Sequence, residues 1–184
     1  MSGSANSRWR LSVATFLFMS GASSTAIAQI NGSWSCDASN GNFREFDTPI
    51  SPRVQLVAGQ MVFDSRDFSG SEIPSAHIAF GDSSNAPDQD HCNCNGIRAQ
   101  IFPDEPDTVK FYMVRNGRAV GMAQGPVGTP ITFAFMIDGN GIMTASIGRT
   151  NPMVKSTKLV SPKRNRVHVT CSNANVRFLS VRTR

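Results

Sequence analysis

Two acidic residues separated by one position form the first pattern that suits catalysis. Glu45 and Asp47 flank Phe46, and residues i and i+2 of a strand lie on one face about 6.5–7 Å apart. Carboxylate pairs at about this separation hydrolyse glycosidic bonds. The same alternation is typical of a solvent-facing strand surface opposite a buried Phe46. Glu45 and Asp47 are therefore candidate catalytic residues, and a purely structural role stays open.

A second chemistry rests on residue types rather than on spacing. A polysaccharide lyase needs a Tyr or His base, together with an Arg or Asn that neutralises the uronate carboxylate. His77, the single tyrosine Tyr112, and Arg115 supply these groups. No spacing links them, so they are equally compatible with separate surface positions. Ser-His-Asp catalysis has no support, because the sequence contains no Gly-x-Ser-x-Gly motif.

The densest group of potential metal ligands lies between residues 82 and 94. The oxygen donors that suit Ca²⁺ there are Asp82, Asp88 and Asp90. The softer donors that suit Zn²⁺ or copper are His91, Cys92 and Cys94. The segment lacks the Asp-x-Asp-x-Asp-Gly spacing of a calcium loop, and its Cys-x-Cys has no second cysteine pair. We expect no cofactor and a disulfide-tied acidic loop, with Ca²⁺ as the alternative.

Residues 1–28 have the pattern of an export signal. Arg8 and Arg10 precede an uncharged apolar run over 11–22, and small residues follow at Ala26 and Ala28. The run is too short for a permanent transmembrane anchor. We therefore expect a single mature domain over 29–184 in the periplasm, at the cell surface or in the medium.

Four cysteines in an exported chain favour disulfide bonds. Three pairings are possible. We expect Cys36–Cys171, which would join the first and last strands, and a tight second bridge between Cys92 and Cys94.

Charge is distributed unevenly along the expected mature chain. Residues 29–107 hold 12 acidic and four basic residues, whereas residues 108–184 hold one acidic and 12 basic residues. This asymmetry permits a basic surface for an anionic partner. It also permits two halves that interleave and neutralise each other. For the first possibility, the candidate binding residues are Arg149, Lys155, Lys158, Lys163, Arg164 and Arg166.

Period-two alternation dominates the chain, and no helical stripe appears. Ile131, Phe133, Phe135 and Ile137 alternate onto one face, and the following Asp138-Gly139-Asn140-Gly141 predicts a hairpin. The expected strands are 54–58, 61–64, 76–80, 97–102, 109–114, 118–123, 131–137, 142–147, 167–171 and 176–182. In the strand at 167–171, we expect Val167, Val169 and Cys171 to point inward while Arg166, His168 and Thr170 point outward. The fold class is therefore an all-β, two-sheet antiparallel sandwich of jelly-roll type.

The layout of residues 76–183 resembles the concanavalin/laminin-G type of jelly roll. The resemblance rests on the strand 131–137, its glycine-rich hairpin, the next strand, and the closing strand pair around Thr170-Cys171-Ser172. It implies a sugar ligand, because this superfamily includes lectins, carbohydrate-binding modules, glycosidases and polysaccharide lyases. The chain lacks the Glu-x-Asp-x-x-Glu strand of the glucanase branch.

Aromatic residues are too few for a typical sugar-stacking platform. Beyond the export signal, Trp34 is the single Trp and Tyr112 the single Tyr. Nucleic acid is disfavoured by the expected compartment and by the missing interleaving of basic and aromatic residues. The leading hypothesis is a non-catalytic exported protein that binds an anionic polysaccharide or another envelope component. The alternatives are a small polysaccharide hydrolase or lyase, and an interaction module without a small ligand.

Overall fold

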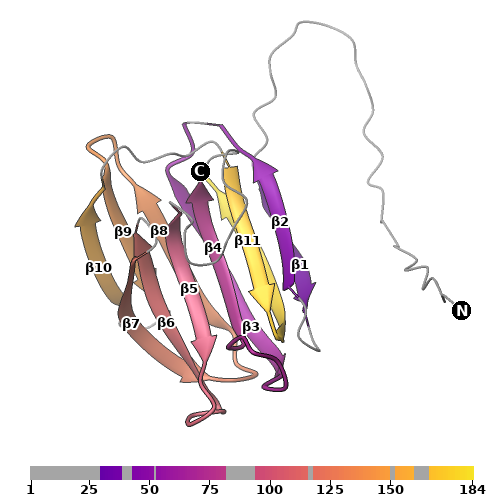
Figure 1. Ribbon diagram of the computed structural model, residues 1–184. Coiled ribbons are helices and arrows are strands. Elements are labelled where there is room, and N and C mark those ends of the chain that lie inside the picture. Colours follow the sequence, from indigo (N-terminus) through magenta and orange to yellow (C-terminus); the bar gives the residue numbers. More distant parts are fainter. Residues whose placement is uncertain are drawn as a thin grey trace, which may run out of the picture.

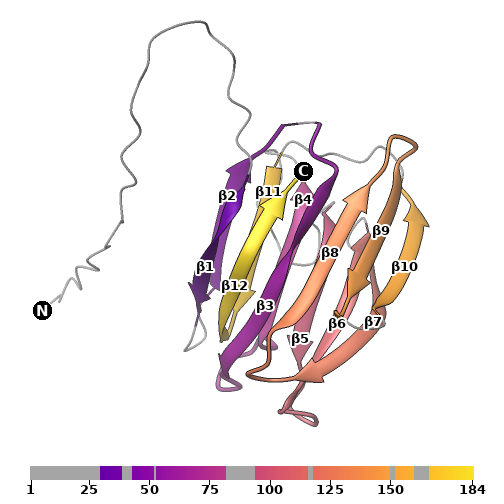
Figure 2. The ribbon, with the colours of Figure 1, turned by 180° about the vertical axis from the view of Figure 1, so that it is seen from behind.

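In the computed structural model, two antiparallel six-stranded sheets pack face to face (Figure 1; Figure 2). The structure describes residues 30–38, 43–51, 53–81, 94–115, 118–149, 152–159 and 166–184, and it leaves the side chains of 43–46 undescribed. All regular elements in these ranges are strands. Within the same ranges, no helix is long and apolar enough to cross a membrane. The predicted all-β sandwich is confirmed.

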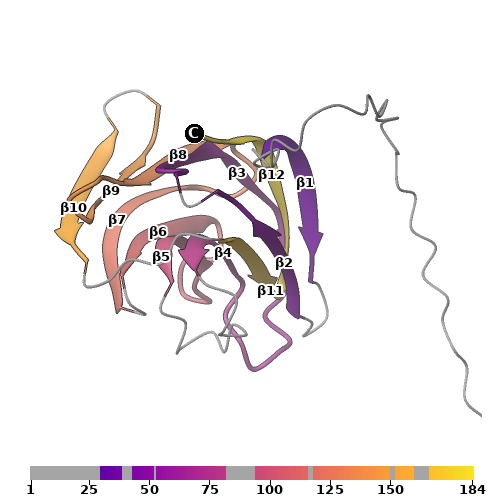
Figure 3. The same ribbon diagram turned by 90° about the horizontal axis from the view of Figure 1, so that it is seen from above.

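The two sheets differ in their strand order. Sheet A follows the order β1-β12-β3-β8-β9-β10. Its strands are β1 (Asn31–Asp37), β12 (Ala174–Thr183), β3 (Leu56–Arg66), β8 (Ile131–Ile137), β9 (Ile142–Ile147) and β10 (Met153–Lys158). Sheet B follows the order β2-β11-β4-β5-β6-β7. Its strands are β2 (Phe43–Pro49), β11 (Arg166–Ser172), β4 (Ser75–Gly81), β5 (Asn95–Ile101), β6 (Thr108–Arg115) and β7 (Arg118–Pro126). Figure 3 shows both layers curving in one direction, with sheet A outside the bend, so the exposed face of sheet B is the concave one.

Alternate side chains fill the core between the sheets. Phe133, Phe135 and Ile137 of β8 are at most 1% exposed, as their alternation predicts. Phe135 meets Phe80 of β4 edge to face, with ring centroids 5.1 Å apart, and so links the two layers. The predicted hairpin after β8 is also confirmed: Asp138 Oδ1 accepts hydrogen bonds from the backbone N–H groups of Asn140 and Ile142 at 2.9 and 2.8 Å.

One buried asparagine turns the chain from sheet B into sheet A. Asn173 lies between β11 and β12 with φ 49° and is 1% exposed. Its Nδ2 donates to the carbonyl of Glu72 at 2.6 Å, and its own carbonyl accepts from the N–H of Asp67 at 2.8 Å. These bonds hold the β3–β4 connection against the corner. The connection therefore covers one end of β11 on the concave face.

The Cys36–Cys171 disulfide is confirmed, with Cα atoms 6.1 Å apart. Its placement corrects one expectation, because it does not join the first and last strands. Cys36 lies on β1 of sheet A, whose hydrogen-bonded neighbour is β12, whereas Cys171 lies on β11 of sheet B. The bridge therefore crosses the core and ties the two sheets together. Cys94 is disulfide-bonded as well, and its predicted partner Cys92 lies outside the described residues.

The strands predicted at 54–58 and 61–64 are one continuous strand, β3. The sequence pattern predicts that the strand is interrupted at Gly59, but this glycine lies within β3 and allows β12 to approach closely. A Cβ atom at Gly59 would lie 2.9 Å from Val181 Cγ2 and 3.1 Å from the Leu179 carbonyl. Ser180, between these two contacts, has φ 51° at a register shift of β12. The glycine therefore accommodates a bulge rather than a turn.

The disulfide supplies our first prediction. The double variant Cys36→Ala/Cys171→Ala should lose about 2–5 kcal/mol of unfolding free energy, because the bridge closes a long loop between residues 135 apart in sequence. Urea denaturation of the variant beside the wild-type protein measures the loss. The comparison uses non-reducing buffer for both proteins, which leaves the bridge at Cys94 intact. An unchanged urea midpoint would contradict the proposed stabilising role.

Candidate functional site

A row of polar residues crosses the concave face of sheet B at one register position. Thr170 of β11 pairs with His77 of β4, His77 pairs with Arg98 of β5, and Arg98 pairs with Tyr112 of β6. Directly opposed residues of an antiparallel pair share a face, and their Cα atoms are about 4.5–5.5 Å apart. The four side chains therefore lie side by side on the four neighbouring strands β11, β4, β5 and β6. Their sequence neighbours Ile78, Ile97 and Met113 are buried in the core.

The predicted catalytic residues thus come together in part. His77 and Tyr112 flank Arg98, which occupies the place that sequence reasoning gave to Arg115. Arg115 instead extends toward sheet A, where its Nη1 donates to Thr157 Oγ1 at 2.6 Å. Glu45 pairs with Thr170 in backbone register, and its side chain lies outside the described residues.

Asp47 is engaged by two basic groups on β11. Its Oδ2 lies 2.5 Å from Arg166 Nε, and its Oδ1 lies 3.4 Å from His168 Nδ1. The hydrogen bond to Asp47 raises the pKa of Arg166 further above its ordinary value. A carboxylate held by two basic groups links β2 to β11, and it is poorly suited to act as an acid or a nucleophile. The arrangement favours a structural role for Asp47.

His168 and Thr170 lie on the outer face of β11 as predicted, but both are buried, at 5% and 6% exposure. His168 is buried because of Gly81, which pairs with Arg166, two residues before His168 on β11, and carries no side chain. A Cβ atom at Gly81 would lie 2.4 Å from His168 Cδ2. The imidazole therefore occupies the space that a side chain at Gly81 would fill, with the cystine sulfur of Cys94 also close to this position. The outward face of a strand need not be solvent-exposed where a curved sheet and its connections cover it.

His77 is the most strongly perturbed titratable group of the row. Its residue is half-buried, but Nε2 is buried and has no hydrogen-bond partner among the described residues. Burial, the positive charge of Arg98 and the proximity of His168 lower the pKa of His77 from 6.5 to about 3. The imidazole is therefore neutral near pH 7, and it presents an unused polar nitrogen beside a guanidinium.

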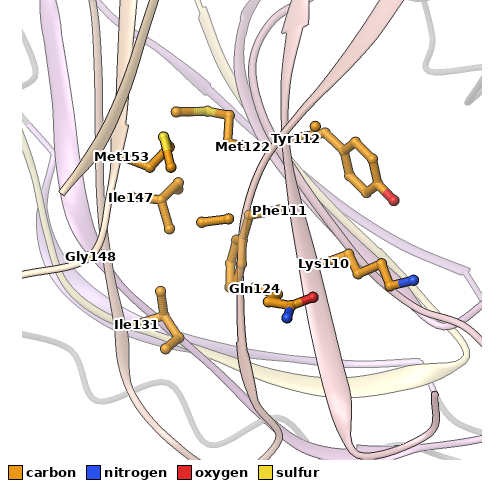
Figure 4. Close-up of a pocket in the computed structure, with 11 residues that line it drawn as sticks. Lys110, Phe111, Tyr112, Met122, Gln124, Ile131, Ile147, Gly148 and Met153 are labelled. Atoms are coloured by element: carbon orange, nitrogen blue, oxygen red, sulfur yellow. The ribbon is translucent and has the colours of Figure 1, made fainter.

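Tyr112 and Lys110 form the β6 side of the site. The ring of Tyr112 lies over Gly121 of β7, where a Cβ atom would be 3.9 Å away. Lys110 Nζ lies 2.7 Å from Glu105 Oε1 and 5.2 Å from the centroid of the Phe102 ring. The bond to Glu105 raises the pKa of Lys110. Tyr112 and Lys110 also border a groove at the β7 edge (Figure 4).

The described members of the predicted basic set lie on two sheets. Lys155 and Lys158 belong to β10 and Arg149 follows β9, all at one edge of sheet A, whereas Arg166 belongs to β11 of sheet B. Arg166 is paired with Asp47, and Lys158 Nζ donates to the carbonyl of Asn140. Lys163 and Arg164 lie outside the described residues. The structure therefore does not gather the described members into one patch.

Ion pairs between described residues show how the acidic and basic halves meet. Arg177 pairs with Asp64 at 2.5 Å, Arg166 with Asp47, and Lys110 with Glu105. Each pair joins an acid from 29–107 to a base from 108–184. The two halves thus interleave, which agrees with the interpretation that the acidic and basic halves neutralise each other. Exposed pairs of this kind contribute little to stability, so their main effect is to neutralise local charge.

The predicted metal ligands, apart from Cys94, fall on residues that the structure does not describe. Asp82, Asp88, Asp90, His91 and Cys92 all lie outside the described residues. Among the described residues, no group of three His, Cys, Asp or Glu side chains is arranged to hold a metal ion.

Sequence reasoning missed Arg98 as a site residue. The signal was present in the alternation of β5, where Ile97, Ala99 and Ile101 are buried and Arg98 lies between them. The sequence does not show the register that aligns Arg98 with His77, 21 positions before it, and with Tyr112, 14 positions after it. Only the pairing of β4, β5 and β6 supplies that alignment.

Comparison with solved structures confirms the predicted concanavalin-like jelly roll at the level of fold. The winged bean acidic lectin, solved with methyl-α-D-galactose, is similar at TM-score 0.54 and 8% identity, over 88% of this chain and 92% of the lectin. The exoplasmic/lumenal domain of VIP36, solved with Ca²⁺ and Man3GlcNAc, is similar at TM-score 0.51 and 9% identity, over 85% of this chain and 82% of that domain. No protein-family model matches the sequence, and no curated protein matches it.

The electrostatics of His77 give a second prediction. An unfolded histidine binds a proton below about pH 6.5, whereas native His77 stays neutral until about pH 3. The unfolded state therefore binds more protons in this window, and the unfolding free energy should fall as the pH drops from 6.5 toward 3. His77→Gln should flatten this slope, as measured by urea denaturation at a series of pH values. An NMR titration of His77 with a midpoint near 6.5 would contradict the assignment.

Proposed function

We propose that this protein binds an anionic polysaccharide on the concave face of sheet B. The observation that carries the proposal is the register row in which Arg98 lies between His77 and Tyr112. A guanidinium presents paired donors to a carboxylate, while the neutral imidazole and the phenol offer hydrogen-bonding groups on either side. A uronate residue has the matching chemistry, because it carries one carboxylate and several hydroxyl groups.

The solved structures support a carbohydrate as the ligand class. The winged bean lectin and the VIP36 domain have the same sandwich architecture and were solved with sugars bound. An anionic sugar suits this chain better than a neutral one, because the described concave face offers Tyr112 as its aromatic group in the row and Trp34 lies on sheet A. Recognition by a charged group therefore replaces the aromatic stacking on which neutral sugars depend.

The proposed setting is outside the cytoplasm. The Cys36–Cys171 bridge is typical of an oxidising compartment, and residues 1–28 carry the pattern of an export signal. A polysaccharide of the cell envelope or of the surrounding medium would meet the protein there. Ca²⁺ at Asp82, Asp88 and Asp90 is a separate prediction from the sequence and is not part of this site.

Substitution of Arg98 tests the binding proposal. Arg98→Gln should weaken retention of the protein in affinity gels that contain alginate or polygalacturonate by at least fivefold at low salt, because the carboxylate loses its charged partner. Arg182→Gln is the matched control, since Arg182 is exposed on β12 of sheet A and its removal lowers the net charge equally. Failure of the wild-type protein to be retained by any anionic polymer at low salt would remove the proposal.

The same row favours a second candidate function, polysaccharide β-elimination. In this reaction the C5 proton of a uronate is removed, its electron pair forms the C4–C5 double bond, the C4–O bond breaks, and the leaving oxygen is protonated. In this reaction His77 Nε2, which is buried and has no hydrogen-bond partner among the described residues, accepts the proton once the imidazole turns toward the substrate, and the Tyr112 hydroxyl donates one. A bound carboxylate would offset the charge of Arg98, one cause of the low pKa of His77, and so make the imidazole more basic.

Absorbance of unsaturated uronate ends separates catalysis from binding alone. If the protein is a lyase, the wild-type protein releases these ends from alginate or polygalacturonate. Tyr112→Phe should then reduce the rate by at least about 100-fold while gel retention falls much less, because Arg98 still binds the carboxylate and the variant loses only the hydrogen bond of the phenol. Retention of the polymer without any new absorbance would exclude the lyase function and leave the binding proposal intact.

A further inference from the structure

The two long edges of the sandwich are built differently. At one edge the Cys36–Cys171 bridge joins sheet A to sheet B. At the opposite edge, where β7 and β10 are the last strands of their sheets, a groove of about 610 Å³ opens between the layers. Figure 4 shows Met153, Ile147 and Ile131 along one side of this groove, with Phe111 facing them. The open edge therefore leaves Met153 exposed and Ile131 half-buried, two apolar side chains that a closed sandwich would bury.

The inner side of the groove is lined by aliphatic, thioether and phenyl side chains, and Lys110, Tyr112 and Gln124 border its outer side. Phe111, Ile147 and Met122 are nearly buried, at 1%, 3% and 8% exposure, while Met153 remains 49% exposed at the mouth. The flexible, unbranched side chains of Met122 and Met153 adapt to an alkyl chain. A sugar ring, in contrast, requires hydrogen-bonding groups around it and a flat aromatic face beneath it. The inner side of the groove therefore differs in chemistry from the polar row on the concave face, and Tyr112 lies at the boundary between the two.

Positive charge lies at the rim of the groove. Arg149 directly follows the lining residue Gly148. Lys155 lies two residues after Met153 on β10, and alternation therefore places it on the same face of the strand. Neither Arg149 nor Lys155 forms an ion pair with a residue that the structure describes. An apolar groove with a cationic rim is complementary to a molecule that has an apolar chain and an anionic head.

We propose that this groove binds one anionic amphiphile, a long-chain fatty carboxylate, independently of the polysaccharide site. The alkyl chain lies against Met122, Ile147 and Met153, and the carboxylate meets Lys155 and Arg149 at the rim. Two sequence-predicted binding residues, Arg149 and Lys155, thereby gain a role that the polar row on sheet B does not give them. Affinity should rise with chain length by up to about fourfold for each methylene buried.

Adjacent residues of β10 provide a matched pair of variants. Met153 faces the groove, whereas Val154, 52% exposed, points to the other side of the strand. Titration with dodecanoate below its micelle concentration, followed by calorimetry, should show saturable binding to the wild-type protein. Met153→Glu should weaken this binding at least tenfold, because it places a carboxylate beside the alkyl chain. Val154→Glu should change the affinity by less than twofold.

The head group is tested separately with a second pair of variants. Lys155→Met should weaken dodecanoate binding at least threefold and leave binding of the neutral analogue dodecanol unchanged, while Lys158→Met on the opposite face should affect neither. This pair alters exposed or half-exposed positions, so it remains informative if Met153→Glu does not fold.

Three outcomes would overturn the proposal. The first is the absence of saturable dodecanoate binding below the micelle concentration. The second is equal loss of affinity in Met153→Glu and Val154→Glu. The third is a wild-type dimer that Met153→Glu converts to a monomer in sedimentation experiments, which would assign the groove to a second copy of the chain. Retention on anionic polysaccharides depends on Arg98, so its presence or absence leaves this test unaffected.

Discussion

The register between β4, β5 and β6 is the constraint on which both faces of sheet B depend. Because side chains alternate, a slip of one residue would move Ile78, Ile97 and Met113 out of the core and turn His77, Arg98 and Tyr112 into it. Backbone packing opposes such a slip. A Cβ atom at Gly96 would lie 2.1 Å from the carbonyl of Ile78 and 2.7 Å from Ala79 Cβ, so the approach of β4 to β5 at this point requires glycine. The same contact that allows the two strands to pair therefore also aligns the polar row.

Local alternation predicts much of this fold, because burial in a sandwich repeats every second residue. The inward residues of β6, β8 and β11 and the hairpin after β8 all follow from it. The missing information is of two kinds. Gly59 has the composition of a break but lies within β3, because its role is set by β12, more than one hundred residues away. His168 has the alternation of an exposed residue but is buried, because Gly81 on another strand leaves room for it. In both cases a strand that is distant in sequence determines the local structure, and the local sequence pattern carries no information about that strand.

The candidate site illustrates the same limit at the level of chemistry. The sequence supplies His77 and Tyr112 as residue types suited to proton transfer, but a choice of Arg115 as their cationic partner rests on nothing but proximity in sequence. Arg115 is directed toward Thr157 of sheet A, and Arg98 takes the central position because β5 lies between β4 and β6. Basic residues selected by sequence clustering separate in a similar way. Arg166 is drawn into a pair with Asp47 on sheet B, while Lys155 lies on the far edge of sheet A.

The contrast between the two edges of the sandwich explains how one small fold offers two surfaces of different character. A covalent link at the β1 edge fixes the spacing of the sheets there, so the layers do not depend on equally tight packing along their whole width. At the β7–β10 edge, Gly125 lies beside Ile131, where a Cβ atom would be 2.6 Å from Ile131 Cδ1. The register shift between Phe111 and Tyr112 adds one residue to β7 at Met122, and such a bulge bends a strand and re-aims its side chains. Met122 consequently contributes to the groove, while Tyr112 on the neighbouring strand remains on the concave face. A local irregularity in one edge strand thus places an apolar surface next to a polar one across a single strand pair, and Tyr112 borders both.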